Sequence, residues 1–305
     1  MRTRVIIIAV LAVIPAIVSA QGIPGWRETS FVATPQGEWT GARLSDGQPD
    51  IAGHWSNTIG NHNNLTDPQG PLPGDRSTRR FKPRGERAPS RVTDPPDGQV
   101  PFQPWARAKQ QEFLKYLNNP IRPEYVEPFA RCAPGGPTKS FLWHGYEIRQ
   151  YPGYVLFLFD SGNRVIYLDG RPHLPANLKL WNGDSRGHWE GNTLVVDTTN
   201  NNSKARLGRS GEFVSENATI AERFIFDPKG DRFTYQATYT DPTVLTRPFT
   251  ITIPNRRITA STPPDDWNNL TFPAKHAGSE PIIEAYERVC VEGNGNHGQV
   301  AVGTK

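Results

Sequence analysis

The sequence predicts one mainly β domain, an antiparallel barrel with one or two peripheral helices and a long irregular N-terminal arm. About ten short alternating or apolar runs follow residue 49, and turn residues separate them at regular spacing. The chain has 28 Gly and 29 Pro but a single Met, which favours many short elements over long helices. Its 305 residues are enough to bury a sizeable core.

The first 20 residues have the pattern of a secretory signal peptide. Arg2 and Arg4 precede an apolar run over residues 5–18, and Ala20 ends a small-residue cleavage site. The apolar run is shorter than the roughly 20 residues that a membrane-spanning helix needs. We therefore expect cleavage near Ala20 and a periplasmic or secreted mature chain that has no membrane span.

The charge pattern gives no sign of a nucleic-acid partner. The formal net charge is +4, and basic residues gather in residues 76–91. Pro, Gly and Glu86 interrupt this segment, as is typical of a solvated loop rather than a nucleic-acid surface. The expected partner is a small molecule, and the sequence leaves the oligomeric state open.

The domain begins after a polar arm over residues 21–48 and extends over residues 49–305. Residues 53–55 read Gly-His-Trp, and a Gly-x-Trp at a first strand is similar to lipocalin and calycin barrels, where the Trp closes one end. Residues 57–103 lack apolar periodicity and predict a long loop, either a surface wrap or a lid. Apolar residues recur at helical spacing over residues 104–118, where Pro104 suits the first turn of a peripheral helix.

The predicted strands follow this helix. Alternating or apolar runs end at turn dipeptides such as Pro152-Gly153 and Gly191-Asn192, a spacing typical of an antiparallel meander. After an entry strand near residues 49–55, the runs are 146–151, 154–159, 164–168, 187–190, 193–198, 218–226, 232–239, 246–253 and 282–291.

The two cysteines, Cys132 and Cys290, predict a disulfide. An even pair in an exported chain is most simply a bond, and the alternative is two buried thiols. The loop that the bond would close is long, so the chain-entropy model gives a stabilisation of about 5 kcal/mol.

Residues 168–199 hold the best candidates for chemistry, because titratable side chains stand there between glycines and tryptophans. Asp169, Arg171 and His173 follow a strand end, and alternate residues of an extended segment share one side. We therefore expect them at a barrel mouth, with Asp169 and His173 as an acid-base pair and Arg171 as anion stabiliser. A second predicted catalytic group comprises Asp184, His188 and Glu190.

These residues also have a structural interpretation. Asp-Gly after a strand is a common turn, Asp197 could be a buried ion-pair partner of Arg223, and residues 187–192 could be a capped hairpin. The neighbouring aromatic side chains likewise fill β cores more often than they line sugar or aromatic sites. With that alternative open, we predict four ligand-binding residues: His144, Tyr146, Trp181 and Trp189.

Metal and nucleophilic chemistry have weaker signals, and we expect no cofactor. His144, His173 and His188 could converge with a carboxylate on zinc or iron, but no short metal-ligand spacing is present. Residues 183–187 fit Gly-x-Ser-x-Gly, yet a strand follows where a nucleophile elbow needs a helix. No phosphate-binding glycine loop is visible.

The motif Asp-Gly-Arg-x-His at residues 169–173 and the run Trp-x-Gly-x-Ser-x-Gly-x-Trp-Glu-Gly-x-Thr-Leu-Val-Val-Asp-Thr at residues 181–198 carry a resemblance. With Glu-Arg-Phe at 222–224 and Thr-Arg-Pro at 246–248, the chain resembles a large uncharacterised family of exported β-rich bacterial proteins over most of residues 49–292. The resemblance implies export and one β-rich domain, and it assigns no residue roles. The chain departs from the family pattern at residues 200–204, and we expect this loop to shape a ligand mouth.

The function expected from these observations is an exported enzyme that uses acid-base chemistry on a small organic or carbohydrate-derived substrate, as a lyase, isomerase or hydrolase. One alternative is a non-catalytic periplasmic protein that binds a small ligand. Another is a structural envelope protein. A binding protein would depend more on Trp181 than on His173 or Asp169, and an envelope protein would have no ligand cavity.

Overall fold

The computed structural model describes residues 34, 36–57, 64–71, 83–142, 145–159 and 162–259. The predicted signal peptide, His144, Cys290 and the predicted strand at 282–291 lie outside the described residues. No helix in the described ranges is long and apolar enough to span a membrane.

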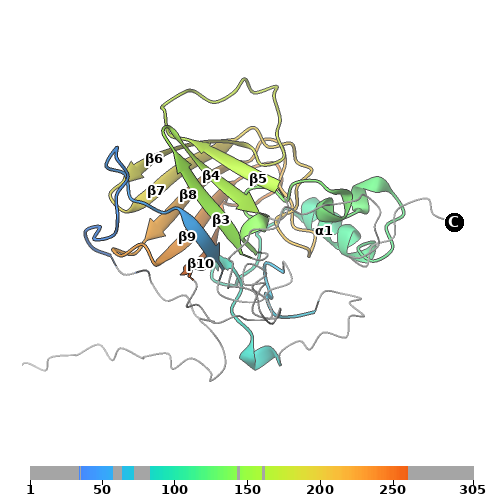
Figure 1. The fold of residues 1–305 in the computed structure, drawn as a ribbon. Coiled ribbons are helices and arrows are strands. Elements are labelled where there is room, and N and C mark those ends of the chain that lie inside the picture. The colour runs from blue at the N-terminus through green and yellow to red at the C-terminus, as the bar shows by residue number, and fades with distance from the viewer. Residues whose placement is uncertain are drawn as a thin grey trace, which may run out of the picture.

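Nine strands close into a mixed β-barrel, which confirms the predicted fold (Figure 1). Neighbouring strands pair in the order β1, β3 to β10, and β10 pairs back onto β1, while β2 adds to β10 outside the ring. The strands are β1 (Gly53–Ser56), β2 (Val92–Asp94), β3 (Tyr146–Tyr151), β4 (Tyr154–Phe159), β5 (Gly162–Tyr167), β6 (Asp184–Glu190), β7 (Thr193–Thr199), β8 (Thr219–Phe226), β9 (Arg232–Thr240) and β10 (Phe249–Ile258).

The local pattern predicted most strands well and missed one. β3 and β4 have the predicted bounds, because Gly153 adopts a φ of +82° in the turn between them. β2 lies inside the predicted loop 57–103, so this part of the prediction was wrong. Its three residues are too few for a visible alternation, and they form a strand because they pair with β10.

One strand pair departs from the predicted antiparallel meander. β5 and β6 are parallel, with Ile166 opposite Ser185 and Tyr167 opposite Arg186. A parallel pair requires the chain to return to the end from which it started. Residues 168–183, hereafter the crossover, make this return outside the strands and form the arch at the top of Figure 1.

The barrel interior is a packed core. Phe141, from η4 (Lys139–Leu142), is fully buried and packs against rings of several strands: Tyr146, Phe157, Phe159, Phe224 and Tyr235. Side chains can fill the interior of a barrel of about eight strands, and aromatic rings are bulky enough to do so. The described part of the interior is therefore a core that positions the barrel walls.

Trp55 closes one barrel end. Its indole is fully buried, donates to the Ile51 carbonyl at 3.0 Å and packs edge-on against Phe226 and Phe233. The Arg257 guanidinium carbon stands 4.6 Å from its ring centroid. The described arm residues lie at this end (Figure 1), and Trp39 of the arm contacts Phe226.

The predicted peripheral helix lies at the opposite end of the barrel (Figure 1). The predicted helix forms as α1 (Pro104–Lys115) and buries Ala106 and Phe113. Two short 3₁₀ turns, η2 (Pro123–Tyr125) and η3 (Pro128–Arg131), follow α1 along the chain. A third, η1 (Arg84–Glu86), lies apart from α1 at the bottom of Figure 1, and η4 belongs to the barrel core.

Candidate functional site

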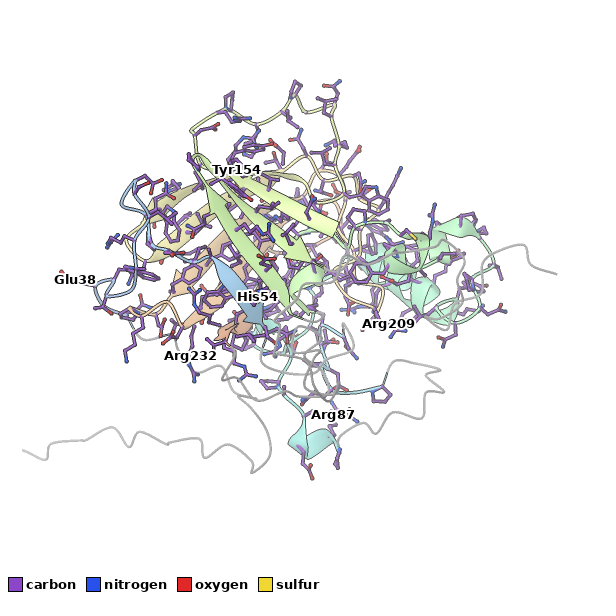
Figure 2. The ribbon with its side chains drawn as sticks, in the orientation of Figure 1. Glu38, His54, Arg87, Tyr154, Arg209 and Arg232 are labelled. Atoms are coloured by element: carbon purple, nitrogen blue, oxygen red, sulfur yellow. The ribbon has the colours of Figure 1, made fainter. Side chains whose placement is uncertain are left out.

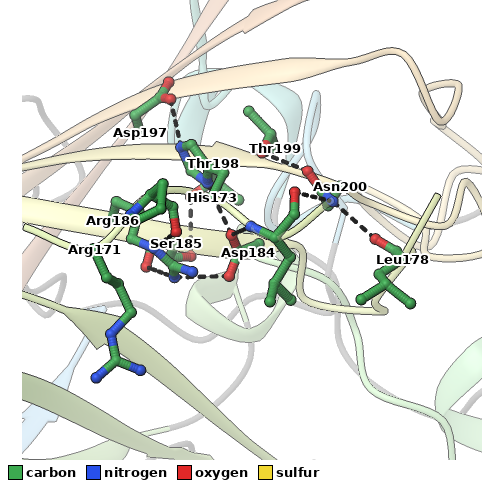
Figure 3. A network of polar contacts seen from close by, with 12 residues as sticks. Arg171, His173, Leu178, Asp184, Ser185, Arg186, Asp197, Thr198, Thr199 and Asn200 are labelled. Atoms are coloured by element: carbon green, nitrogen blue, oxygen red, sulfur yellow. Dashed lines mark hydrogen bonds and ion pairs between the residues drawn. The ribbon is translucent and has the colours of Figure 1, made fainter. Parts of the chain in front are cut away.

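His173 lies between two carboxylates on the outer wall of the barrel (Figure 3). Its Nδ1 is 2.9 Å from Asp184 Oδ2, at the start of β6, and its Nε2 is 2.9 Å from Asp197 Oδ2 of β7. The two acids differ in environment, since the Asp184 side chain is 4% exposed and that of Asp197 is 61% exposed. The ring can donate to both carboxylates only as the imidazolium.

Asp184 ties the crossover to the wall. Besides His173, its carboxylate accepts a bond from the Leu174 amide at 2.9 Å and pairs with Arg186 Nη1 at 2.7 Å. Arg186 in turn donates to the Pro172 carbonyl at 3.1 Å. Because both ends of this network reach the crossover, its most direct physical effect is to fix the crossover against β6.

Asp169 and Arg171 do not join His173. They pair with each other, with Arg171 Nε 2.8 Å from Asp169 Oδ2, and both are well exposed. The hydrogen bonds from Arg171 hold the pKa of Asp169 below its ordinary value. The Arg171 guanidinium stacks on the Tyr167 ring and points away from Asp184 in Figure 3. The expected grouping at a mouth is therefore absent, because the segment leaves β5 as a turn instead of continuing extended.

His188 and Glu190 face outward on β6. Glu190 Oε1 is 3.3 Å from His188 Nε2, and its Oε2 accepts from Arg223 at 3.1 Å. The bonds from His188 and then Arg223 hold the pKa of Glu190 below its ordinary value. Arg223 thus pairs with Glu190 rather than Asp197, and all of these side chains are exposed.

Two predicted ligand-binding aromatics belong to the barrel packing. Tyr146 is fully buried, donates to Asn255 Oδ1 at 2.7 Å, and has its pKa raised by burial. Trp189 packs against Phe226 and donates to Gln48 Oε1 at 2.8 Å. His144 lies outside the described residues.

Trp181 has a different place, in the wall of an open hollow of about 580 Å³. Three parts of the chain surround this hollow beside the α1 end of the barrel: α1 itself, the η2–η3 segment, and the connections between strands. Apolar side chains form much of its wall, namely Trp105, Phe113, Val126, Trp181, Phe213, Val214 and Val244. The hollow is the candidate functional site.

Comparisons of the chain with protein-family models, curated proteins and solved structures find no match.

The weaker alternatives meet specific obstacles in the described part of the chain. No group of three potential His, Cys, Asp or Glu ligands gathers there as a metal site. Ser185 faces the barrel interior and accepts from Arg164 Nη2 at 2.9 Å, so residues 183–187 do not form a nucleophile elbow. Cys132 follows η3, but Cys290 lies outside the described residues, so the disulfide stays a prediction.

Two buried polar groups escaped the sequence predictions. Arg164 and Glu222 pair inside the barrel, and Lys139, Glu127 and Glu212 are buried behind η3 and η4. The strand pattern could have revealed the first pair, because Arg164 and Glu222 stand at inward-facing positions. Arg164 is two residues before buried Ile166, and Glu222 is two residues before buried Phe224.

Proposed function

We propose that this protein is an exported binding protein for a small organic ligand, which it holds in the hollow beside Trp181. The hollow itself carries the proposal: its volume of about 580 Å³ falls in the range typical of small-molecule sites, roughly 300–1,000 Å³. Mouths of β-barrels are common places for such sites, where connecting loops vary without disturbing the barrel.

The composition of the wall supports an apolar or aromatic ligand. Trp105 is 53% exposed although it is large and apolar, and its ring lies 6.1 Å from that of Phe213. Exposed aromatic faces beside buried ones offer stacking surface at little cost in side-chain entropy. Ser203 and Lys204, from the loop that departs from the family pattern, also line the hollow.

A ligand screen by thermal shift tests this proposal. The panel contains aromatic acids, phenolics, fatty acids and sugars, and each compound is tested on the parent protein and on Trp181→Ala. We expect a compound class to raise the parent melting temperature and to lose most of that shift in the variant. Trp189→Phe is the matched control, because Trp189 is an aromatic residue outside the hollow, and its response to ligand should stay like the parent's.

Acid-base catalysis at His173 is the second candidate. It is favoured by one observation, the suspension of the imidazole between Asp184 and Asp197. Carboxylates within hydrogen-bond distance of both nitrogens fix the orientation of the ring, as in many acid-base sites. The hollow wall does not include His173, Asp169 or His188, which is why binding is the leading proposal.

Assays with any compound found to bind separate the two candidates. A catalyst at this position should lose turnover without unfolding in His173→Ala, and Asp169→Asn should then show whether the exposed Asp169–Arg171 pair takes part. If bound compounds are recovered unchanged from the parent protein after long incubation, the catalytic proposal is wrong and the binding proposal remains.

A further inference from the structure

Arg206 brings a positive charge to the apolar hollow. The residue lines the hollow from the β7–β8 connection, and its guanidinium carbon stands 3.9 Å from the Phe113 ring centroid. Its nitrogens donate only to main-chain carbonyls: Nη2 to Glu124 at 3.1 Å, and Nη1 to Lys204 and Ala205 at 3.5 and 3.4 Å. Figure 2 shows Arg209, from the same connection, beside the α1 end of the barrel.

The charge of Arg206 is not balanced by a neighbouring acid. Within the described residues it contacts no carboxylate, and burial lowers the pKa of its guanidinium to about 10. The Arg206 side chain is half-buried. A charge that is partly withdrawn from water is normally paired, because an unpaired ion pays a desolvation penalty. A guanidinium without a carboxylate partner in a ligand-sized hollow is therefore a favourable binding partner for an anion.

Glu124 and Lys109, two other charged residues that line the hollow, are paired elsewhere and do not neutralise Arg206. Glu124 pairs with Arg122 at 3.0 Å, and Lys109 is paired with Glu112 at 3.0 Å. Lys204 is exposed at the rim and adds a further positive charge. The hollow thus combines an aromatic wall with a net positive field, which attracts anions.

We propose that the ligand is an amphipathic carboxylate, whose acid group binds Arg206 and whose aromatic or apolar body packs against Trp181, Trp105 and Phe213. The proposal rests on the binding function proposed above and names its ligand class. A guanidinium offers two parallel donors to a carboxylate, which a neutral ligand cannot replace. Lys204 would strengthen the attraction from the rim.

Naphthylacetate and its neutral analogue naphthylacetamide are a matched pair of probes for this test. Dissociation constants are measured by tryptophan fluorescence and calorimetry on the purified protein. We expect the anion to bind about 10-fold or more tightly than the amide, because a desolvated charged hydrogen bond has that effect. Arg206→Gln should bring the ratio of the two dissociation constants toward one, mainly because the anion binds the variant more weakly.

Arg149→Gln is the charge-matched control, because Arg149 is an exposed arginine that pairs with Glu147 and does not line the hollow, and it should leave the ratio unchanged. Lys204→Gln keeps the proposal testable if Arg206→Gln fails to fold, with an expected loss of about 2- to 3-fold in anion affinity. An equal loss of anion affinity in Arg149→Gln and Arg206→Gln would overturn the assignment.

The outcomes also separate this inference from the proposed function. If both probes bind the parent equally and Trp181→Ala weakens both, the carboxylate inference is wrong and the binding function stands. If neither probe binds at millimolar concentration, or if Trp181→Ala changes neither affinity, both proposals are overturned.

Discussion

Arg164 and Glu222 form a bidentate ion pair inside the barrel, where their side chains are 1% and 0% exposed. Arg164 Nη1 reaches Glu222 Oε2 at 2.8 Å and Nη2 reaches Oε1 at 2.5 Å, while Tyr235 donates to the same carboxylate at 2.7 Å. Burial alone would lower the pKa of Arg164, but the Glu222 charge and hydrogen bonds raise it above its ordinary value. The two charges therefore depend on each other.

Removing one partner of this pair should be strongly destabilising. Arg164→Met leaves the Glu222 carboxylate buried without its counter-charge, and we expect a loss of about 3–5 kcal/mol in the free energy of unfolding. Urea denaturation of the parent and variant, followed by far-UV circular dichroism, measures the loss.

The double variant Arg164→Met with Glu222→Leu is the internal check. It removes both charges, so much of the loss should return, since apolar replacements of similar volume are tolerated in place of buried pairs. Glu190→Gln, which breaks the exposed contact with Arg223, should cost less than about 1 kcal/mol. A double variant no more stable than Arg164→Met would contradict this account.

Asp184 and Asp197 should interact with His173 with different energies. Double-mutant cycles pair His173→Ala with Asp184→Asn and with Asp197→Asn, and their coupling energies are read from thermal or urea unfolding. We expect about 1.5 kcal/mol or more for the buried Asp184 and below about 1 kcal/mol for Asp197, which is 61% exposed. Equal couplings would mean that exposure does not control this contact.

Glu212 should make stability fall as pH rises from about 4.5 to about 7. Its carboxyl is buried, and desolvation raises its pKa from 4.5 in the unfolded reference to about 7. The folded state holds this proton longer than the unfolded state, so the favourable contribution is complete below pH 4.5 and lost by about pH 7. At about 1.4 kcal/mol per pKa unit, the loss is about 3–4 kcal/mol.

Glu212→Gln isolates this effect, because an amide keeps the shape of the neutral acid and does not titrate. The stability of the variant relative to the parent should rise between pH 4.5 and 7, and Glu216→Gln, an exposed control, should show no such rise. Parallel pH profiles for the parent and Glu212→Gln would exclude the assigned cause.

Phe141 should be essential to the barrel core. Phe141→Ala removes a ring that five other rings contact, and the cavity left behind should cost about 3–5 kcal/mol. Leu178→Ala, at a side chain that is 47% exposed, should change stability by less than about 0.5 kcal/mol. Chemical denaturation of both variants checks the contrast.

The sequence pattern was sufficient to predict strands that are defined by neighbouring residues along the chain. β3 and β4 were predicted because alternation and a Pro-Gly turn act over a dozen residues. The parallel pairing of β5 with β6 was not predictable in the same way, because it depends on how the crossover packs against the outer wall through Asp184 and His173.

The candidate site was predicted only in part. Aromatic content pointed to Trp181, which lines the hollow, and to Tyr146 and Trp189, which the core uses instead. Arg206 has no periodic pattern around it, and its placement requires α1 and the β7–β8 connection to meet. The residue spacing in a single sequence does not indicate contacts between segments so far apart in the chain.

The packed interior of the barrel separates the residues that stabilise the fold from the residues that shape the hollow. In a hollow barrel, a residue that contacts the ligand also supports the wall, so a change of specificity disturbs folding. Here Phe141 and the Arg164–Glu222 pair occupy the interior, and the hollow is bordered by α1, short turns and the connections between strands. Exchange of these bordering segments can therefore change the shape and charge of the hollow, while the nine strands keep their core.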